Sequence, residues 1–161
     1  MTPEPEADVT PAEPPRLLLV GTEPFARELA QQAALLDWSA QTTTDLDESL
    51  AALEDLGPGD AVIVLEHQHK IANPVLVAAL ASEVGYVGAL GSRRMRDARV
   101  RLLRDAGATD DQLAALHCPT GLDLGARSPA ESAVSIVAEI IAARSGRDPQ
   151  SLRASTNQIS A

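Results

Sequence analysis

The sequence predicts an α/β fold, with an open, mostly parallel sheet and helices on both faces. Short apolar runs alternate along the chain with segments whose apolar residues recur at helical spacing, as in βαβ units. Only three aromatic residues occur, Phe25, Trp38 and Tyr86, so Ala, Val, Leu and Ile must build the core, as in helix-covered parallel sheets. A chain of 161 residues is long enough to bury such a core as one domain.

Four extended runs are expected to form strands. The run 61–65 is the strongest of them, because it is fully apolar and rich in β-branched residues. The run 39–43 is the weakest, because it is polar and rich in threonine. In chain order, the expected strands cover residues 17–20, 39–43, 61–65 and 84–90.

Helical patterns lie between these runs and after them. Asn73 is expected to cap the third helix and Pro74 to begin it, since proline is favoured in the first helical turn. The expected helices cover residues 25–36, 46–56 and 74–82, begin again at residue 93, cover 109–116 and begin a last time at 129. The inward-facing residues are expected to be Met95, Ala98, Leu102 and Ala106 in the helix from residue 93, and Val134, Val137 and Ile141 in the last helix.

Both ends of the chain differ in composition from the middle. Residues 1–15 hold five prolines and four acidic side chains, which predicts a disordered arm. From residue 146 onward the chain is polar and aperiodic, which predicts a flexible tail of residues 146–161. We therefore expect one folded domain over residues 16–145.

Composition also narrows the functional classes. A net charge of −10 argues against nucleic-acid binding, since affinity for a duplex depends on neutralising phosphates. A single cysteine, Cys118, excludes an internal disulfide and fits a reducing compartment. No apolar stretch is long enough to cross a membrane, and the start lacks the pattern of a signal peptide. The expected location is the cytoplasm.

The strongest candidate site is a glycine-rich strand end that leads into an arginine-rich helix. Six of the twelve arginines lie between residues 93 and 104. Gly88 and Gly91 allow close approach of the backbone, and Ser92 is a good N-cap. A helix N-terminus with Arg93 and Arg94 beside it suits a phosphate or another anion. The alternative is a solvated helix face whose arginines pair with neighbouring aspartates.

The loop after the first expected strand occupies the place of a dinucleotide-binding fingerprint. It carries Glu23 where a glycine should let the backbone touch a pyrophosphate, and a carboxylate there is bulky and repulsive. The second expected strand is followed by threonines rather than by a ribose-binding acid. NAD(P) is therefore not expected to bind, and a structural role for this half is favoured over the alternative of an NAD(P)-dependent oxidoreductase.

Two further loops contribute candidates. His67 follows the third expected strand and could contact a ligand or exchange a proton, although loop histidines commonly have no role. No cluster of cysteine and histidine accompanies it, so no metal site is expected. Gly121 and Asp123 lie in a tight turn where Asp123 could accept hydrogen bonds from a ligand, or could only redirect the chain. Cys118 is interpreted as a packing residue rather than a reactive thiol.

In this order, these motifs closely resemble the C-terminal Rossmann-like domain of the XdhC/CoxI family. The residues that carry the resemblance are 62–65 with His67, Asn73-Pro74, 86–94, Leu116-His117, 121–125 and 129–131. The resemblance is strong over residues 61–145 and topological over 16–60. The chain departs from the family at Glu23, where members often have a glycine-rich loop, and in lacking the separate N-terminal domain with its cysteine motif.

The resemblance implies an accessory factor for xanthine dehydrogenase, carbon monoxide dehydrogenase or a related molybdenum hydroxylase. Such a factor binds molybdenum cofactor (molybdopterin) and helps deliver it in sulfurated form, which implies a cofactor-binding chaperone rather than an enzyme. On this basis His67, Gly88, Gly91, Ser92, Arg93, Arg94, Gly121 and Asp123 are the expected cofactor-binding residues. The implied partners are a client hydroxylase and its maturation machinery, with a homodimer as an assembly to test. A non-catalytic interaction module is the remaining alternative.

Overall fold

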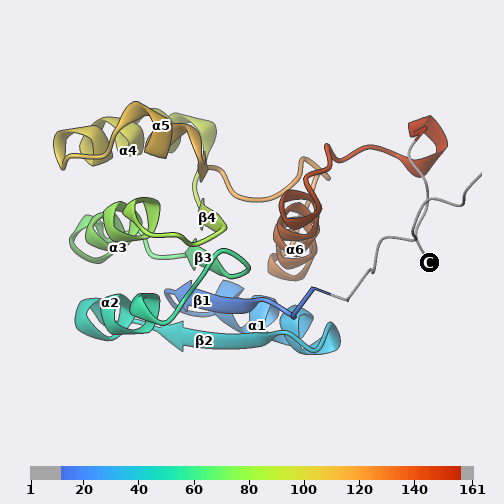
Figure 1. Ribbon diagram of the computed structural model, residues 1–161, viewed down its shortest axis with the longest axis horizontal. Coiled ribbons are helices and arrows are strands. Elements are labelled where there is room, and N and C mark those ends of the chain that lie inside the picture. The colour runs from blue at the N-terminus through green and yellow to red at the C-terminus, as the bar shows by residue number, and fades with distance from the viewer. Residues whose placement is uncertain (1–11, 157–161) are drawn as a thin grey trace, which may run out of the picture.

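The computed structural model describes residues 12–156 and confirms the α/β fold. In this part of the chain five strands form one sheet in the order β2-β1-β3-β4-β5, and every neighbouring pair is parallel (Figure 1). The strands are β1 (Arg16–Val20), β2 (Ser39–Thr43), β3 (Ala61–Val64), β4 (Tyr86–Ala89) and β5 (Leu116–His117). The direction of strand order reverses between β1 and β3, which is the topological switch point of the sheet.

Helices cover both faces of the sheet, as the sequence predicts. The helices of the described residues are α1 (Phe25–Leu35), α2 (Leu46–Glu54), α3 (His69–Ala81), α4 (Arg93–Asp105), α5 (Asp110–Ala114) and α6 (Pro129–Ser145). Figure 1 shows α2, α3, α4 and α5 along one face, while α1 and α6 lie on the other. Each face of the sheet therefore has its own apolar layer.

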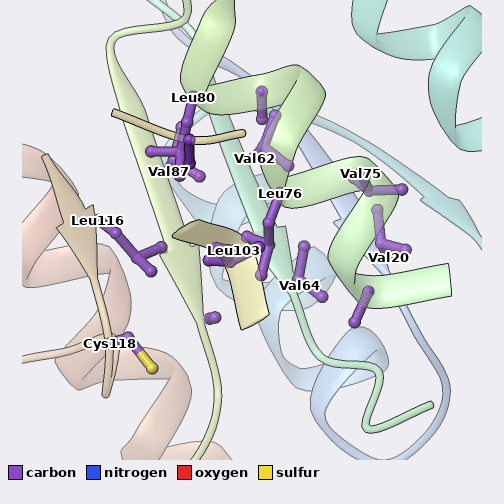
Figure 2. Close-up of a cluster of buried hydrophobic side chains, with 14 of the residues drawn as sticks. Val20, Val62, Val64, Val75, Leu76, Leu80, Val87, Leu103, Leu116 and Cys118 are labelled. Atoms are coloured by element: carbon purple, nitrogen blue, oxygen red, sulfur yellow. The ribbon is translucent and has the colours of Figure 1, made fainter. Parts of the chain in front are cut away.

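Alternation along the strands divides the core into these two layers. In β1, for example, Leu18 and Val20 belong to the cluster beneath α2, α3 and α4, whereas Leu17 and Leu19 belong to the cluster beneath α1 and α6. Figure 2 shows the first cluster, in which Leu76 and Leu103 bring α3 and α4 onto the strands. Cys118 is buried in the same cluster, consistent with the packing role predicted for it.

Several local signals in the sequence mark helix ends. Ser92 caps α4, as predicted, Ser128 caps α6, and Thr109 caps α5 in a reciprocal arrangement with Gln112. Gly146 ends α6 in the left-handed conformation, with φ of 64°. The weak run at Ser39–Thr43 forms β2 at the edge of the sheet, where mostly exposed side chains are tolerated.

The prediction for the start of α3 is wrong. The helix begins at His69, so Pro74 lies inside it and Asn73 does not cap it. The early turn is stabilised because Gln68 C=O accepts hydrogen bonds from the Ile71 and Ala72 N–H groups, while Ala72 is fully buried. Pro74 lies on the exposed side of the helix.

The predicted inward face of α4 is also wrong, and that of α6 is correct only at Val137. Met95 and Leu102 are 40% exposed, and α4 instead buries Arg99 and Leu103. This rotation gives the Arg99 guanidinium a partner, because its Nη1 donates to the Leu90 C=O over 2.8 Å. In α6, Val134 and Ile141 are exposed, whereas the buried stripe is Ala133, Ile136, Val137 and Ile140.

The expected helix at 109–116 is shorter than predicted, since α5 ends at Ala114 and Leu116 enters β5. Beyond Gly146, the short 3₁₀ helix η1 (Leu152–Ala154) lies within the segment predicted as a flexible tail. Most of the predicted N-terminal arm (residues 1–11) and residues 157–161 of the tail lie outside the described residues. Within residues 12–156, no helix has both the length and the apolar character that crossing a membrane requires.

Candidate functional site

The candidate site is a cavity of about 370 Å³ at the carboxyl ends of β4 and β5. Four of the eight predicted site residues line it: Gly91, Arg93, Gly121 and Asp123. The remaining lining comes from Leu90, Pro119, Thr120, Leu122, Ala126, Ser132, Ser135 and Ile136. The cavity thus lies between the N-terminus of α4, the loop after β5 and the first half of α6, away from the switch point between β1 and β3.

The first turn of α4 presents positive charge to the cavity. Ser92 Oγ accepts a hydrogen bond from the Met95 N–H over 3.2 Å, so this serine is engaged in capping the helix. Arg93 and Arg94 are both exposed, but only Arg93 lines the cavity. Neither forms an ion pair within the described residues, whereas Arg96 and Arg104 lie 3.8 Å and 2.9 Å from Asp97 and Asp110. The helix N-terminus adds attraction for an anion at the same place.

The loop after β5 forms the opposite wall. Gly121 has φ of +105°, and a Cβ there would lie 2.5 Å from Ser135 Oγ, so only glycine fits between the loop and α6. The Leu122 N–H donates to the Ser135 C=O, and Ser135 Oγ donates to the Leu122 C=O over 2.6 Å. These reciprocal hydrogen bonds fix residues 121 and 122 against α6 and leave Asp123 exposed beside the cavity.

Gly88 has a structural reason to be glycine. It is buried in β4, and a Cβ there would lie 2.5 Å from Thr120 Oγ1 and 2.9 Å from Tyr86 Cε1. Gly88 therefore makes room for the side chain of Thr120, which does line the cavity. Gly88 itself does not line the cavity, so its role in binding stays a prediction.

A partly buried carboxylate behind this wall is not among the predicted site residues. Glu139 Oε2 accepts hydrogen bonds from the Tyr86 hydroxyl over 2.5 Å and from the Gly121 N–H over 2.7 Å. The Tyr86 and Thr120 hydroxyls lie 2.6 Å apart. Burial, together with the neighbouring Glu139 carboxylate, raises the pKa of Tyr86, so the phenol remains protonated and donates. On the sequence, Glu139 is one charge in a helix, 53 residues from Tyr86.

His67 lies elsewhere on the carboxyl edge of the sheet. It is exposed in the loop after β3, its N–H donates to Glu66 Oε1 over 2.8 Å, and it does not line the cavity. In the loop after β1, Glu23 is exposed and its carboxylate lies 3.3 Å from Arg27. No cluster of three or more His, Cys, Asp or Glu side chains suited to a metal ion occurs in the part of the chain that the structure describes.

The fold and this cavity define the class of protein: a Rossmann-type α/β domain with a ligand-sized cavity at the carboxyl ends of its strands. Parallel α/β sheets of the Rossmann type bind their ligands beyond the carboxyl ends of the strands, and the cavity lies at this position. A guanidinium, a helix N-terminus and one carboxylate suit a ligand that carries both an anionic group and hydrogen-bond donors.

Comparison with known proteins identifies the family. The XdhC Rossmann domain family matches residues 17–140, and the chain belongs to this family. The sequence is 31% identical over 147 residues to the uncharacterized protein YqeB of Escherichia coli K12, covering 79% of this chain and 27% of YqeB. It is 30% identical over 129 residues to the molybdenum cofactor insertion chaperone PaoD of the same organism, covering 80% of this chain and 40% of PaoD.

A third relative is a probable xanthine dehydrogenase subunit from Bacillus subtilis 168, 30% identical over 81% of this chain and 43% of the relative. The crystal structure of a xanthine dehydrogenase from Bacillus halodurans shares the fold, with a TM-score of 0.65 and 24% identity over 89% of this chain and 45% of that chain. The chain spans between about a quarter and under half of the length of these relatives.

Proposed function

We propose that this domain binds molybdenum cofactor, or its phosphate or nucleotide part, as a cargo for delivery to a molybdenum hydroxylase. Two relatives support the proposal, since one is called a molybdenum cofactor insertion chaperone and the other a probable xanthine dehydrogenase subunit. The observation that carries it is the convergence of Gly91 and Arg93 with Gly121 and Asp123 in a single cavity. The proposed partners are a client hydroxylase and its maturation machinery in the cytoplasm.

The residues of the cavity fit such a cargo. A volume of about 370 Å³ lies within the range of small-molecule sites. Arg93 would hold the phosphate with the first turn of α4, because a guanidinium presents paired donors to phosphate oxygens. Asp123 would accept hydrogen bonds from the amino and ring N–H groups of the pterin. When bound, the cofactor supplies its molybdenum and sulfur chemistry to the client, whereas this chain only holds, orients and releases it.

Copurified cofactor tests the proposal. The protein is isolated from a host that makes molybdenum cofactor, and bound pterin is released, oxidised and measured by fluorescence alongside a metal analysis. Arg93→Ala is expected to lower the pterin content at least about tenfold, equivalent to about 1.4 kcal/mol of binding free energy. Arg94→Ala should cause a smaller loss, because its side chain does not line the cavity.

Arg101→Ala is the matched control, since Arg101 is an exposed arginine two turns further along α4 and outside the cavity. Equal pterin content in the Arg93→Ala and Arg101→Ala variants would contradict the proposed site. A titration of the same protein with NAD(H) and NADP(H) addresses the oxidoreductase alternative, for which we expect no tight binding. Stable association with a client hydroxylase without any copurified pterin would support the interaction-module alternative instead.

A further inference from the structure

Besides Ser135, a second side chain on α6 contacts the cavity wall from behind. Glu139 Oε2 receives hydrogen bonds from Tyr86 and from the Gly121 N–H, and Tyr86 in turn contacts Thr120. Because Thr120 and Gly121 both line the cavity, this carboxylate contributes to where that part of the wall lies.

The second oxygen of the same carboxylate faces a histidine. His117 Nδ1 lies 3.3 Å from Glu139 Oε1, and the His117 ring stacks on Tyr86 with a centroid separation of 4.3 Å. The histidine is one-third exposed, so protons from solvent can reach it. It borders a second hollow of about 340 Å³ together with Arg147 and Asp148, which follow α6.

We propose that Glu139 is a positioning residue for the cargo cavity, and that the charge of His117 modulates how firmly Glu139 holds Thr120 and Gly121. This inference rests on the proposed function only in the identity of the cargo. When His117 is protonated, its Nδ1–H donates a charge-assisted hydrogen bond to Oε1, and the carboxylate is held at both oxygens. When His117 is neutral, that contact weakens, and Glu139 keeps only the hydrogen bonds at Oε2.

The directions of the hydrogen bonds follow from the chemistry of the groups. Tyr86 has one hydroxyl proton and donates it to Glu139, so the Thr120 hydroxyl donates to the Tyr86 oxygen. The titratable groups in contact with His117 are Tyr86 from β4 and Glu139 from α6, and Arg147 and Asp148 from the segment after α6 line the same hollow.

Nuclear magnetic resonance of the full chain without cargo tests the coupling. With both groups followed across a pH series, the Gly121 amide shift should change together with the charge of the His117 ring. In Glu139→Gln, which keeps an acceptor oxygen but removes the charge, the Gly121 shift should no longer follow His117. If the Gly121 amide shift in the unaltered protein does not change with the charge of His117, the proposal is overturned.

Copurified pterin tests the consequence for the cavity. Glu139→Ala should lower the pterin content at least about tenfold relative to the unaltered protein. Glu139→Gln, measured at the same pH, should retain pterin to within about threefold of the unaltered protein, a difference below about 1 kcal/mol. Glu83→Gln, an exposed carboxylate outside the cavity, is the control for charge removal. A folded Glu139→Ala with unchanged pterin content would refute the positioning role. If no variant and not even the unaltered protein retains pterin, the proposed function fails, and the amide titration still decides this inference.

Discussion

The two edges of the sheet use charged residues in opposite ways. At the amino edge, Asp60 accepts hydrogen bonds from the Arg16 side chain at 2.6 Å, from the Arg16 N–H at 2.8 Å and from the Gly57 N–H at 2.9 Å. At the carboxyl edge, Arg93 and Asp123 line a cavity, and neither forms an ion pair within the described residues. The comparison teaches that Arg16 and Asp60 stabilise the fold by pairing, whereas Arg93 and Asp123 have no ion-pair partner among the described residues.

The largest effect is expected at the amino edge, from Gly85→Ala. A Cβ at Gly85 would lie 1.9 Å from the Pro58 carbonyl oxygen, which is main chain and cannot move aside cheaply. We expect a loss of about 3 kcal/mol in the free energy of unfolding, measured by denaturant titration. Pterin content per folded molecule should stay unchanged, and a drop in it would break the separation between the two edges.

Asp60→Asn should cost less, about 2 kcal/mol, because the charge-assisted hydrogen bonds from Arg16 are weakened while the side chain keeps its size. Again the pterin content should not change. Asp47→Asn, an exposed aspartate near the start of α2, is the control and should stay within about 0.5 kcal/mol of the unaltered protein.

The same variant predicts a pH dependence. Burial acts to raise the pKa of Asp60, but the hydrogen bonds from Arg16 and Gly57 outweigh burial and hold that pKa below its usual value. A carboxyl whose pKa falls on folding contributes full stability above its unfolded pKa, about 3.9, and loses it as the pH falls through the folded pKa. The stability gap between the unaltered protein and Asp60→Asn should therefore narrow below about pH 4. A gap that stays constant down to about pH 2 would contradict the role of the ion pair.

At the carboxyl edge, Ser135→Ala should cost about 1 kcal/mol, because the Leu122 C=O loses its hydroxyl donor. Since residue 135 lines the cavity, pterin content should fall as well, which distinguishes this variant from the two at the amino edge. Ser145→Ala removes another hydroxyl from α6, near its C-terminus and outside the cavity, and serves as the control. Pterin retention that is equal in both variants would remove Ser135 from the site.

The smallest effect on stability is expected for Arg93→Gln, within about 0.5 kcal/mol, because the side chain is exposed and has no ion-pair partner among the described residues. Thermal unfolding of the cargo-free protein measures this expectation. A clear destabilisation would show that Arg93 contributes to the fold, and the contrast between the two edges would then be lost.

The sequence predicts four of the five strands, because β1, β3 and β4 are short apolar runs with their own turn signals, whereas the two-residue β5 is too short for such a pattern. Even the polar run at Ser39–Thr43 is located correctly, since the alternation of elements demands a strand there. The errors concern helices whose inward face depends on tertiary contacts. The periodicity of α4 favours Met95 and Leu102, but the contact of Arg99 with the Leu90 C=O selects a neighbouring face.

The candidate site is predictable in part, because some of its residues lie in local sequence patterns and others do not. Gly91, Arg93, Gly121 and Asp123 lie in glycine-containing motifs at strand ends, so local patterns reveal them. Ser132, Ser135 and Glu139 lie in α6, where each resembles a solvated polar residue of an amphipathic helix. Their roles arise only when α6 packs beside β4 and the loop after β5, a pairing of distant segments that no local pattern contains.

The burial of Arg99 has a mechanical consequence for α4. Only 2% of Arg99 is exposed, and its guanidinium donates to the Leu90 C=O directly after β4. Sliding or rotating the helix would therefore leave a buried charge without its hydrogen-bond acceptor. The first turn of α4 is therefore held in place relative to the strand ends without any ligand. A rigid receptor loses little conformational entropy on binding, so more of the attraction between Arg93 and the proposed anionic cargo would appear as affinity.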